Sequence, residues 1–394
     1  MKKFILFILS FVAAFSLSAA PKRGVVEYFS PELITLTNNK VSISIAPAAL
    51  GRVVSFKINE TGAEMLNPTK LTRLWLSPLH EIRGDNFQGI RELLWSGKIN
   101  GSIPMQVVKK SDDSITVYSK SYGASSFEVT RTVTMLPEGF GFVWQTKLTN
   151  KSPKAEKCDL WYNFQGVEPA LPRIPVAGGT QKVRGKGAET YPRDFMFVKG
   201  VGPYYLPPGA DYAAFVEANQ NAVWAVLLPE TEMKPDGFFY SWGNNSPNSI
   251  RTVEPLLKTR TLKPGATAES QMTMLIFPGL TDFAGMLKMT GFEVKVQEKS
   301  GFCKFMNSIK SFFGADTCDK IYTLRLVNAV NAPAETLEVE LNGKKSAKKF
   351  SFSLNERKAG TMLEFELDID EFPETGKVKL GRESGKLFFP LENK

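Results

Sequence analysis

The sequence is poor in the side chains that most catalytic and metal sites use. It contains one histidine, His80, and three cysteines in 394 residues. The cysteines form no CxxC pair and no cluster with the histidine, so we predict no metal site and no cofactor. A single histidine also excludes any mechanism that needs two. His80 is the one side chain whose unperturbed pKa lies near neutral pH.

Long apolar runs are also absent after the first 20 residues. Lys2 and Lys3 precede an apolar stretch, Phe4 to Phe15, and small residues follow as far as Ala20. This order is typical of a secretory signal peptide. The stretch is shorter than the roughly 20 residues that a spanning helix prefers. We therefore predict a periplasmic or secreted protein, with an N-terminal membrane anchor as the alternative if the segment is not cleaved.

The two late cysteines, Cys303 and Cys318, flank a short segment. In an oxidising compartment such a pair predicts a disulfide, whereas Cys158 lies in an expected strand and is predicted to be a buried thiol. Between the two, aromatic and aliphatic residues from Phe302 to Phe313 fall at helical spacing. The resulting helix is interpreted either as a surface for a membrane or protein partner or as a helix packed on a sheet edge.

Positively charged residues outnumber negatively charged ones in the sequence. The net charge is +9, and +7 without Lys2 and Lys3. In an exported protein this balance favours anionic lipid or polyanionic glycan over nucleic acid, so no nucleic-acid partner is predicted. The charges are spread along the chain, which is also typical of a basic surface with no specific partner.

Alternation of apolar and polar residues is the strongest structural signal. It runs from Phe127 to Met135 and resumes from Phe140 to Leu148, with Pro137-Glu138-Gly139 between. A period of two on both sides of a turn predicts an antiparallel hairpin with one buried face. A third strand is expected to run into Trp161, and we place these strands at the centre of a large antiparallel sheet.

The C-terminal part alternates in a similar way. Short runs from Tyr322 to Leu380 are separated by turn signals such as Asn342-Gly343. Strands of this length and spacing predict a small immunoglobulin-like β-sandwich. Thr281 to Met289 is expected to be helical.

Short motifs between residues 30 and 280 resemble the galactose mutarotase-like superfamily. The segments that carry the resemblance are Val41–Ile45, Gly51–Phe56, Thr61–Glu64, Thr130–Thr132, Leu148–Ser152 and Leu262–Gly265. The resemblance implies a mainly β supersandwich. With it, the predicted organisation is a signal peptide at 1–20, a supersandwich at 21–280, a helical linker at 281–320 and the small sandwich at 321–394.

Two further segments locally resemble the periplasmic domain of YidC-type membrane insertases. They are Ala213–Pro229 and Leu262–Leu280. A polar β region follows where that family has its membrane core, so insertase activity is not implied. A periplasmic scaffold or chaperone-like role is the alternative function that this resemblance favours.

The epimerases of the mutarotase-like superfamily pair a histidine acid with a glutamate base. Asn163 stands where the histidine is expected, and asparagine does not exchange a proton near neutral pH. Glu254 matches the glutamate position. The resemblance therefore implies non-catalytic binding of an oligosaccharide or polysaccharide, and His80 and Glu254 are the catalytic candidates if the protein is an enzyme.

Candidate ligand-binding residues combine tryptophans, which stack on sugar faces, with groups that bond hydroxyls. They are Trp75, Arg91, Trp95, Trp161, Asn163, Gln165 and Trp242. Each tryptophan is also a typical core residue. A glycan lyase using His80, Arg83 and Tyr191, or a hydrolase with two carboxylates, is a further alternative.

Overall fold

The structure is a computed structural model, and β-strands dominate it. The residues it describes are 25–28, 32–66, 72–75, 82–83, 89–94, 104–121, 126–167, 172–173, 179–183, 187–191, 202–205, 212–228, 238–241, 252–298, 320–343, 347–369, 373–387 and 389. In this part of the chain the sheets are antiparallel, and two 3-10 turns, Pro47–Ala49 and Ala218–Gln220, are the only helical elements. The predicted mainly β fold class is confirmed.

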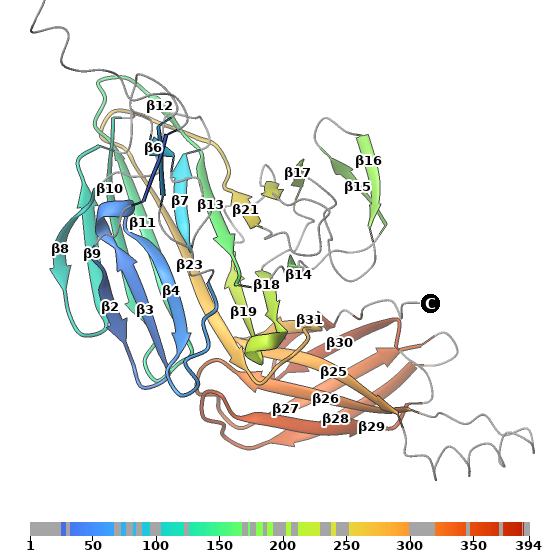
Figure 1. Ribbon diagram of the computed structural model, residues 1–394. Helices are drawn as coiled ribbons and strands as arrows, with labels where there is room; N and C mark the ends of the chain where they lie inside the picture. Colours follow the sequence, from blue (N-terminus) through green and yellow to red (C-terminus); the bar gives the residue numbers. More distant parts are fainter. Residues whose placement is uncertain are drawn as a thin grey trace, which may run out of the picture.

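An eight-stranded sheet forms one layer of the larger unit (Figure 1). Its order is β14 (Pro172–Arg173), β18 (Tyr212–Glu217), β19 (Ala222–Leu227), β23 (Thr267–Pro278), β11 (Gly141–Asn150), β10 (Phe127–Met135), β9 (Ser114–Ser119) and β8 (Gln106–Lys110). The hairpin expected from the alternation is β10–β11, in which Met135 pairs with Phe142. Every second residue of β10 is buried, so this prediction is confirmed.

A seven-stranded sheet forms the facing layer. Its order is β16 (Gly187–Tyr191), β15 (Gly179–Val183), β17 (Gly202–Tyr205), β20 (Phe238–Ser241), β21 (Thr252–Leu256), β13 (Leu160–Gln165) and β7 (Arg91–Leu94). The strand that runs into Trp161 belongs here and not beside β11, so the expectation of a third strand in the same sheet is wrong. At the end of β11, the Asn150 amide donates to the carbonyls of Lys154 and Leu262. These bonds fix the conformation of the loop through which the chain passes from the eight-stranded sheet toward β13.

Three smaller sheets complete this unit. They are β2 (Ile34–Thr37), β3 (Val41–Ala46) and β4 (Arg52–Ile58); β1 (Val25–Tyr28), β5 (Thr72–Trp75) and β6 (Ile82–Arg83); and β12 (Glu156–Cys158) with β22 (Arg260–Leu262). A bridge between Val53 and Ile90 joins β4 to the edge beside β7.

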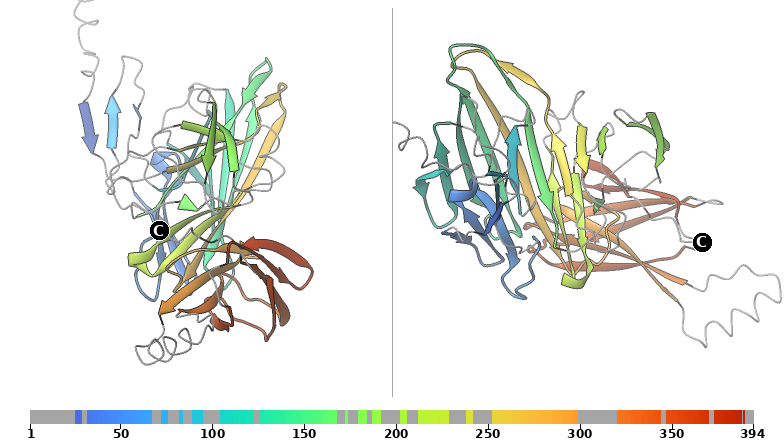
Figure 2. Two further views of the ribbon diagram at one scale, coloured as in Figure 1. Left: turned by 90° about the vertical axis from the view of Figure 1, so that its right-hand side faces the viewer. Right: turned by 45° about the horizontal axis from the view of Figure 1, so that its top comes forward.

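A second unit consists of two four-stranded sheets that enclose their own core. One has the order β24 (Gly285–Leu287), β25 (Thr290–Glu298), β26 (Lys320–Asn328) and β29 (Met362–Leu367), and the other β28 (Ala347–Leu354), β27 (Glu335–Asn342), β30 (Thr375–Leu380) and β31 (Glu383–Leu387). In both views of Figure 2 its orange and red strands gather at one end of the larger unit.

The helix expected from Thr281 is wrong, because the second unit already begins there. Leu287 pairs with Thr290 across a two-residue turn, in which Lys288 and Met289 have φ of 49° and 60°. Such a turn usually contains Asn-Gly, and Lys-Met gives no such signal. The boundary predicted at residue 321 therefore lies about 35 residues too late, and residues 299–319 lie outside the described residues.

The two units meet at the tip of the β10–β11 hairpin. The Phe140 amide donates to the carbonyl of Ala329 at 2.7 Å. Gly360 has φ +82°, and a Cβ there would lie 2.6 Å from the Phe140 ring, so the ring packs closely only against glycine. The core of the larger unit continues into Val327 and Ala329.

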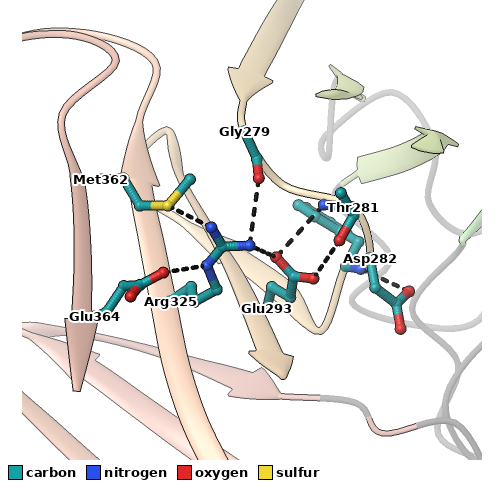
Figure 3. Close-up of polar contacts among 8 residues, drawn as sticks. Gly279, Thr281, Asp282, Glu293, Arg325, Met362 and Glu364 are labelled. Carbon is teal, nitrogen blue, oxygen red and sulfur yellow. Dashed lines mark hydrogen bonds and ion pairs between the residues drawn. The ribbon is translucent and has the colours of Figure 1, made fainter. Parts of the chain in front are cut away.

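Polar contacts centred on Arg325 hold the segment that follows β23 against the second unit (Figure 3). Its guanidinium donates to Glu293 at 3.0 Å, to Glu364 at 2.7 Å and to the Gly279 carbonyl at 3.4 Å. Glu293 in turn accepts from the Thr281 hydroxyl at 2.9 Å. The segment that leaves β23 is thus held by side chains of the small sandwich.

Candidate functional site

Strand β13 supplies the candidate site from the middle of the seven-stranded sheet. Because side chains alternate along a strand, Tyr162 and Phe164 point one way and Trp161, Asn163 and Gln165 point the other. The Tyr162 hydroxyl reaches Ser270 on β23, at 2.8 Å, so its side faces the eight-stranded sheet. The set with Asn163 therefore lies on the outer face of the seven-stranded sheet.

Asn163 is the most unusual polar residue on this face. Its side chain is fully buried, and neither its amide nitrogen nor its amide oxygen has a hydrogen-bond partner within the described part of the chain. The side-chain oxygen of Gln165 is also buried and also lacks a hydrogen-bond partner within the described residues. An unsatisfied buried amide costs about 1–3 kcal/mol, so such groups call for an explanation.

Glu254 lies beside Asn163 on the neighbouring strand. Trp161 pairs with Leu256 and Phe164 with Val253, which places Glu254 level with Asn163. Glu254 is buried and accepts a hydrogen bond from the Thr252 hydroxyl at 2.5 Å. The two residues that the superfamily resemblance singled out are thus direct neighbours.

On the other side of β13, the backbone of Arg91 pairs with Asn163 and that of Glu92 with Tyr162. Glu92 is fully buried and forms a 3.1 Å ion pair with Arg131 on β10. The Arg131 guanidinium stacks on the Trp144 ring, 4.5 Å from its centroid, and donates to the Leu50 carbonyl. This pair joins the two layers directly behind the site.

Tyr162 lies against that ion pair. Burial raises the pKa of its phenol well above the ordinary value of 10.0, and the neighbouring Glu92 carboxylate raises it further. The hydrogen bond to Ser270 and the charge of Arg131 lower the pKa with smaller effect. The phenol of the folded protein is therefore expected to keep its proton at pH values where an exposed tyrosine ionises.

A Tyr162→Phe variant is expected to resist alkali better than the natural protein. With its folded pKa raised, Tyr162 contributes stability that is present below about pH 10 and is lost as the pH rises toward the folded pKa. The natural protein should then lose about 1.4 kcal/mol more per pH unit than the variant in this range. Urea titrations of both proteins near pH 7 and above pH 10 measure the free energy of unfolding at each pH. The same dependence of this free energy on pH in both proteins would contradict the prediction.

The structure describes only part of the predicted site. Trp161, Asn163 and Gln165 share one face of β13, and Glu254 joins them from β21. Only the backbone is described for Arg91, Trp75, Arg83 and Tyr191, which lie in β7, β5, β6 and β16. The other predicted positions lie outside the described residues: His80, Trp95, Trp242, Cys303, Cys318 and Phe302 to Phe313.

Sequence reasoning missed Arg131, Glu92 and Thr252. Arg131 falls in the same alternating set as Phe127, Val129 and Val133, so the period of two already placed its side chain on the buried face. Its carboxylate partner had no comparable local signal.

Across the described residues no group of three or more metal-binding side chains occurs, and no helix is long and apolar enough to cross a membrane.

No protein-family model matches the chain, and no curated protein matches it in sequence. Solved structures similar to it include a galactose mutarotase-like protein from Lactobacillus casei, with 14% identity, 62% of this chain and 100% of that chain covered, and a TM-score of 0.47. A galactose mutarotase related enzyme from Lactobacillus acidophilus has 11% identity, with 63% of this chain and 98% of that chain covered and a TM-score of 0.46.

A galactose mutarotase-like protein from Clostridium acetobutylicum shares 14% identity over 65% of this chain and 99% of that chain, with a TM-score of 0.42. These structures are of the class that the sequence motifs resemble. At such identities and scores they say nothing about what this chain binds. The insertase resemblance and the scaffold role attached to it stay predictions.

Proposed function

We propose that this protein is an exported, non-catalytic carbohydrate-binding protein whose ligand lies on the outer face of β13. The observation that carries the proposal is Asn163, a fully buried amide with both polar atoms unsatisfied in the described part of the chain. A bound group that donates and accepts hydrogen bonds would satisfy it.

Hydroxyl groups fit this face better than charged groups do. An amide offers two donors and one acceptor oxygen, and a hydroxyl both donates and accepts. The carboxylate on the neighbouring strand, Glu254, accepts a hydrogen bond from the Thr252 hydroxyl, as a carboxylate oxygen would from a sugar hydroxyl. Trp161, half-buried two residues before Asn163, supplies an aromatic surface for an apolar ring face.

The proposal is binding without turnover. Acid–base chemistry at an anomeric centre needs two groups that exchange protons. In the pair formed by Asn163 and Glu254, only the glutamate does so. Residues 1–20 have the order of a signal peptide, and this supports a site of action outside the cytoplasm.

Isothermal titration calorimetry of the full chain against neutral and anionic mono- and oligosaccharides tests the proposal. We expect saturable binding that Trp161→Ala weakens about tenfold, because stacking on the indole is lost. Phe365→Ala is the matched control, since Phe365 is another half-buried aromatic residue but lies in the second unit.

A folded protein that binds no sugar in the panel would contradict the proposal. Equal loss of binding in the two variants would contradict the placement of the site. Interconversion of sugar anomers by the purified protein would show that it is catalytic, which contradicts the proposal of binding without turnover.

A further inference from the structure

Strands β28, β27, β30 and β31 form one sheet of the second unit (Figure 1). The outer face of this sheet carries an ordered set of charged residues. The strand register aligns Lys349, Glu340, Lys377 and Lys386 in one row across the four strands. The adjacent row is formed by Ser351, Glu338, Lys379 and Ser384. We call these eight residues the lysine face, and its four lysines outnumber its two glutamates.

Two of these lysines are paired with carboxylates. Lys379 lies 3.1 Å from Glu338 and Lys349 lies 3.6 Å from Glu340. Lys377 and Lys386 are directly opposite each other on β30 and β31, and neither forms an ion pair with a described carboxylate. Like charges placed opposite each other in a sheet are destabilising, so an anion between them would be favourable.

The lysine face is also hollowed. A groove of about 430 Å³ lies over it, lined by residues of both rows, among them Glu338, Lys349, Lys377 and Ser384. Lys386 is not one of the lining residues, but the strand register places it directly opposite Lys377. With strands about 4.8 Å apart, the row from Lys349 to Lys386 spans about 14 Å. The serine hydroxyls at the two ends of the second row add groups that hydrogen-bond to oxygen atoms.

We propose that the lysine face binds an anionic polysaccharide, with sulfate or carboxylate groups against Lys377 and Lys386. The excess of positive charge supplies the complementarity, and the groove admits a narrow chain. The large exposed hydrophobic side chains of the described residues, Leu33, Val107, Val108 and Val296, all lie elsewhere. A membrane surface, which apolar side chains would help to hold, is therefore the less favoured occupant.

Calorimetry of the full chain at low salt tests this proposal with heparin, polygalacturonate and neutral dextran. We expect both polyanions to bind and dextran not to bind at this face. Lys377→Ser/Lys386→Ser should weaken polyanion binding roughly tenfold. Lys57→Ser/Lys154→Ser removes the same charge from exposed positions of the larger unit and should leave binding unchanged.

A second variant keeps the test independent of folding. Glu338→Gln/Glu340→Gln removes the competing carboxylates and should strengthen polyanion binding, an effect that a damaged protein does not give. No binding of either polyanion, or equal weakening by the two lysine double variants, would overturn the proposal. Binding to vesicles of phosphatidylcholine and phosphatidylserine, without binding to polysaccharide, would replace it with a membrane surface. The proposal does not rest on the Asn163 site.

Discussion

Replacing Arg131 with methionine is expected to lower the free energy of unfolding by about 3–5 kcal/mol. The substitution leaves the fully buried Glu92 carboxylate without its guanidinium partner, and an uncompensated buried charge is costly. It also removes the donor to the Leu50 carbonyl and the cation on the Trp144 ring. Urea denaturation at neutral pH measures the loss.

A double variant separates the charge from the packing. Arg131→Met/Glu92→Leu should recover most of the stability, because a buried ion pair is often replaced by apolar residues at little cost. Lys147→Met is the matched control on the adjacent strand β11. Its ion pair with Glu269 is more than half exposed, so the loss should be under about 1 kcal/mol. Equal losses at Arg131 and Lys147 would contradict the importance of burial.

Asn163→Leu is expected to stabilise the protein and to weaken carbohydrate binding. Leucine has a similar size, and it removes two buried polar atoms that lack partners, so the free energy of unfolding should rise by about 1–2 kcal/mol. Sugar affinity should fall by more than about tenfold, since the amide would no longer bond the ligand. Thermal denaturation and calorimetry on one preparation measure both effects.

Asn150 provides the control for this substitution. It is as deeply buried as Asn163, but its amide donates to two carbonyls and its oxygen accepts from the Ser152 amide. Asn150→Leu should therefore destabilise the protein by about 2–3 kcal/mol. If Asn163→Leu destabilises it to the same extent, Asn163 has a structural role and the proposed site is wrong.

The alternation of β10 and β11 was readable because a period of two is local. It predicts the hairpin. The same period would also place Arg131 on the buried face, but Arg131 and its partner Glu92 were not singled out from the sequence. The start of the second unit was not readable. There the apolar residues around Phe283 and Met286 fit a short helix as well as a strand, and the Lys288-Met289 turn lacks the residues that mark such turns.

The sequence by itself determined the mainly β class and the alternation of buried and exposed side chains along the strands. It also contains the segments that resemble the mutarotase-like superfamily. It also singled out Asn163 and Glu254 by type and position. Only the tertiary structure decided that these two residues are neighbours and that Glu92 meets Arg131. They are distant in the chain, and strand order in a sheet depends on long-range pairing and shared burial, which no local pattern encodes.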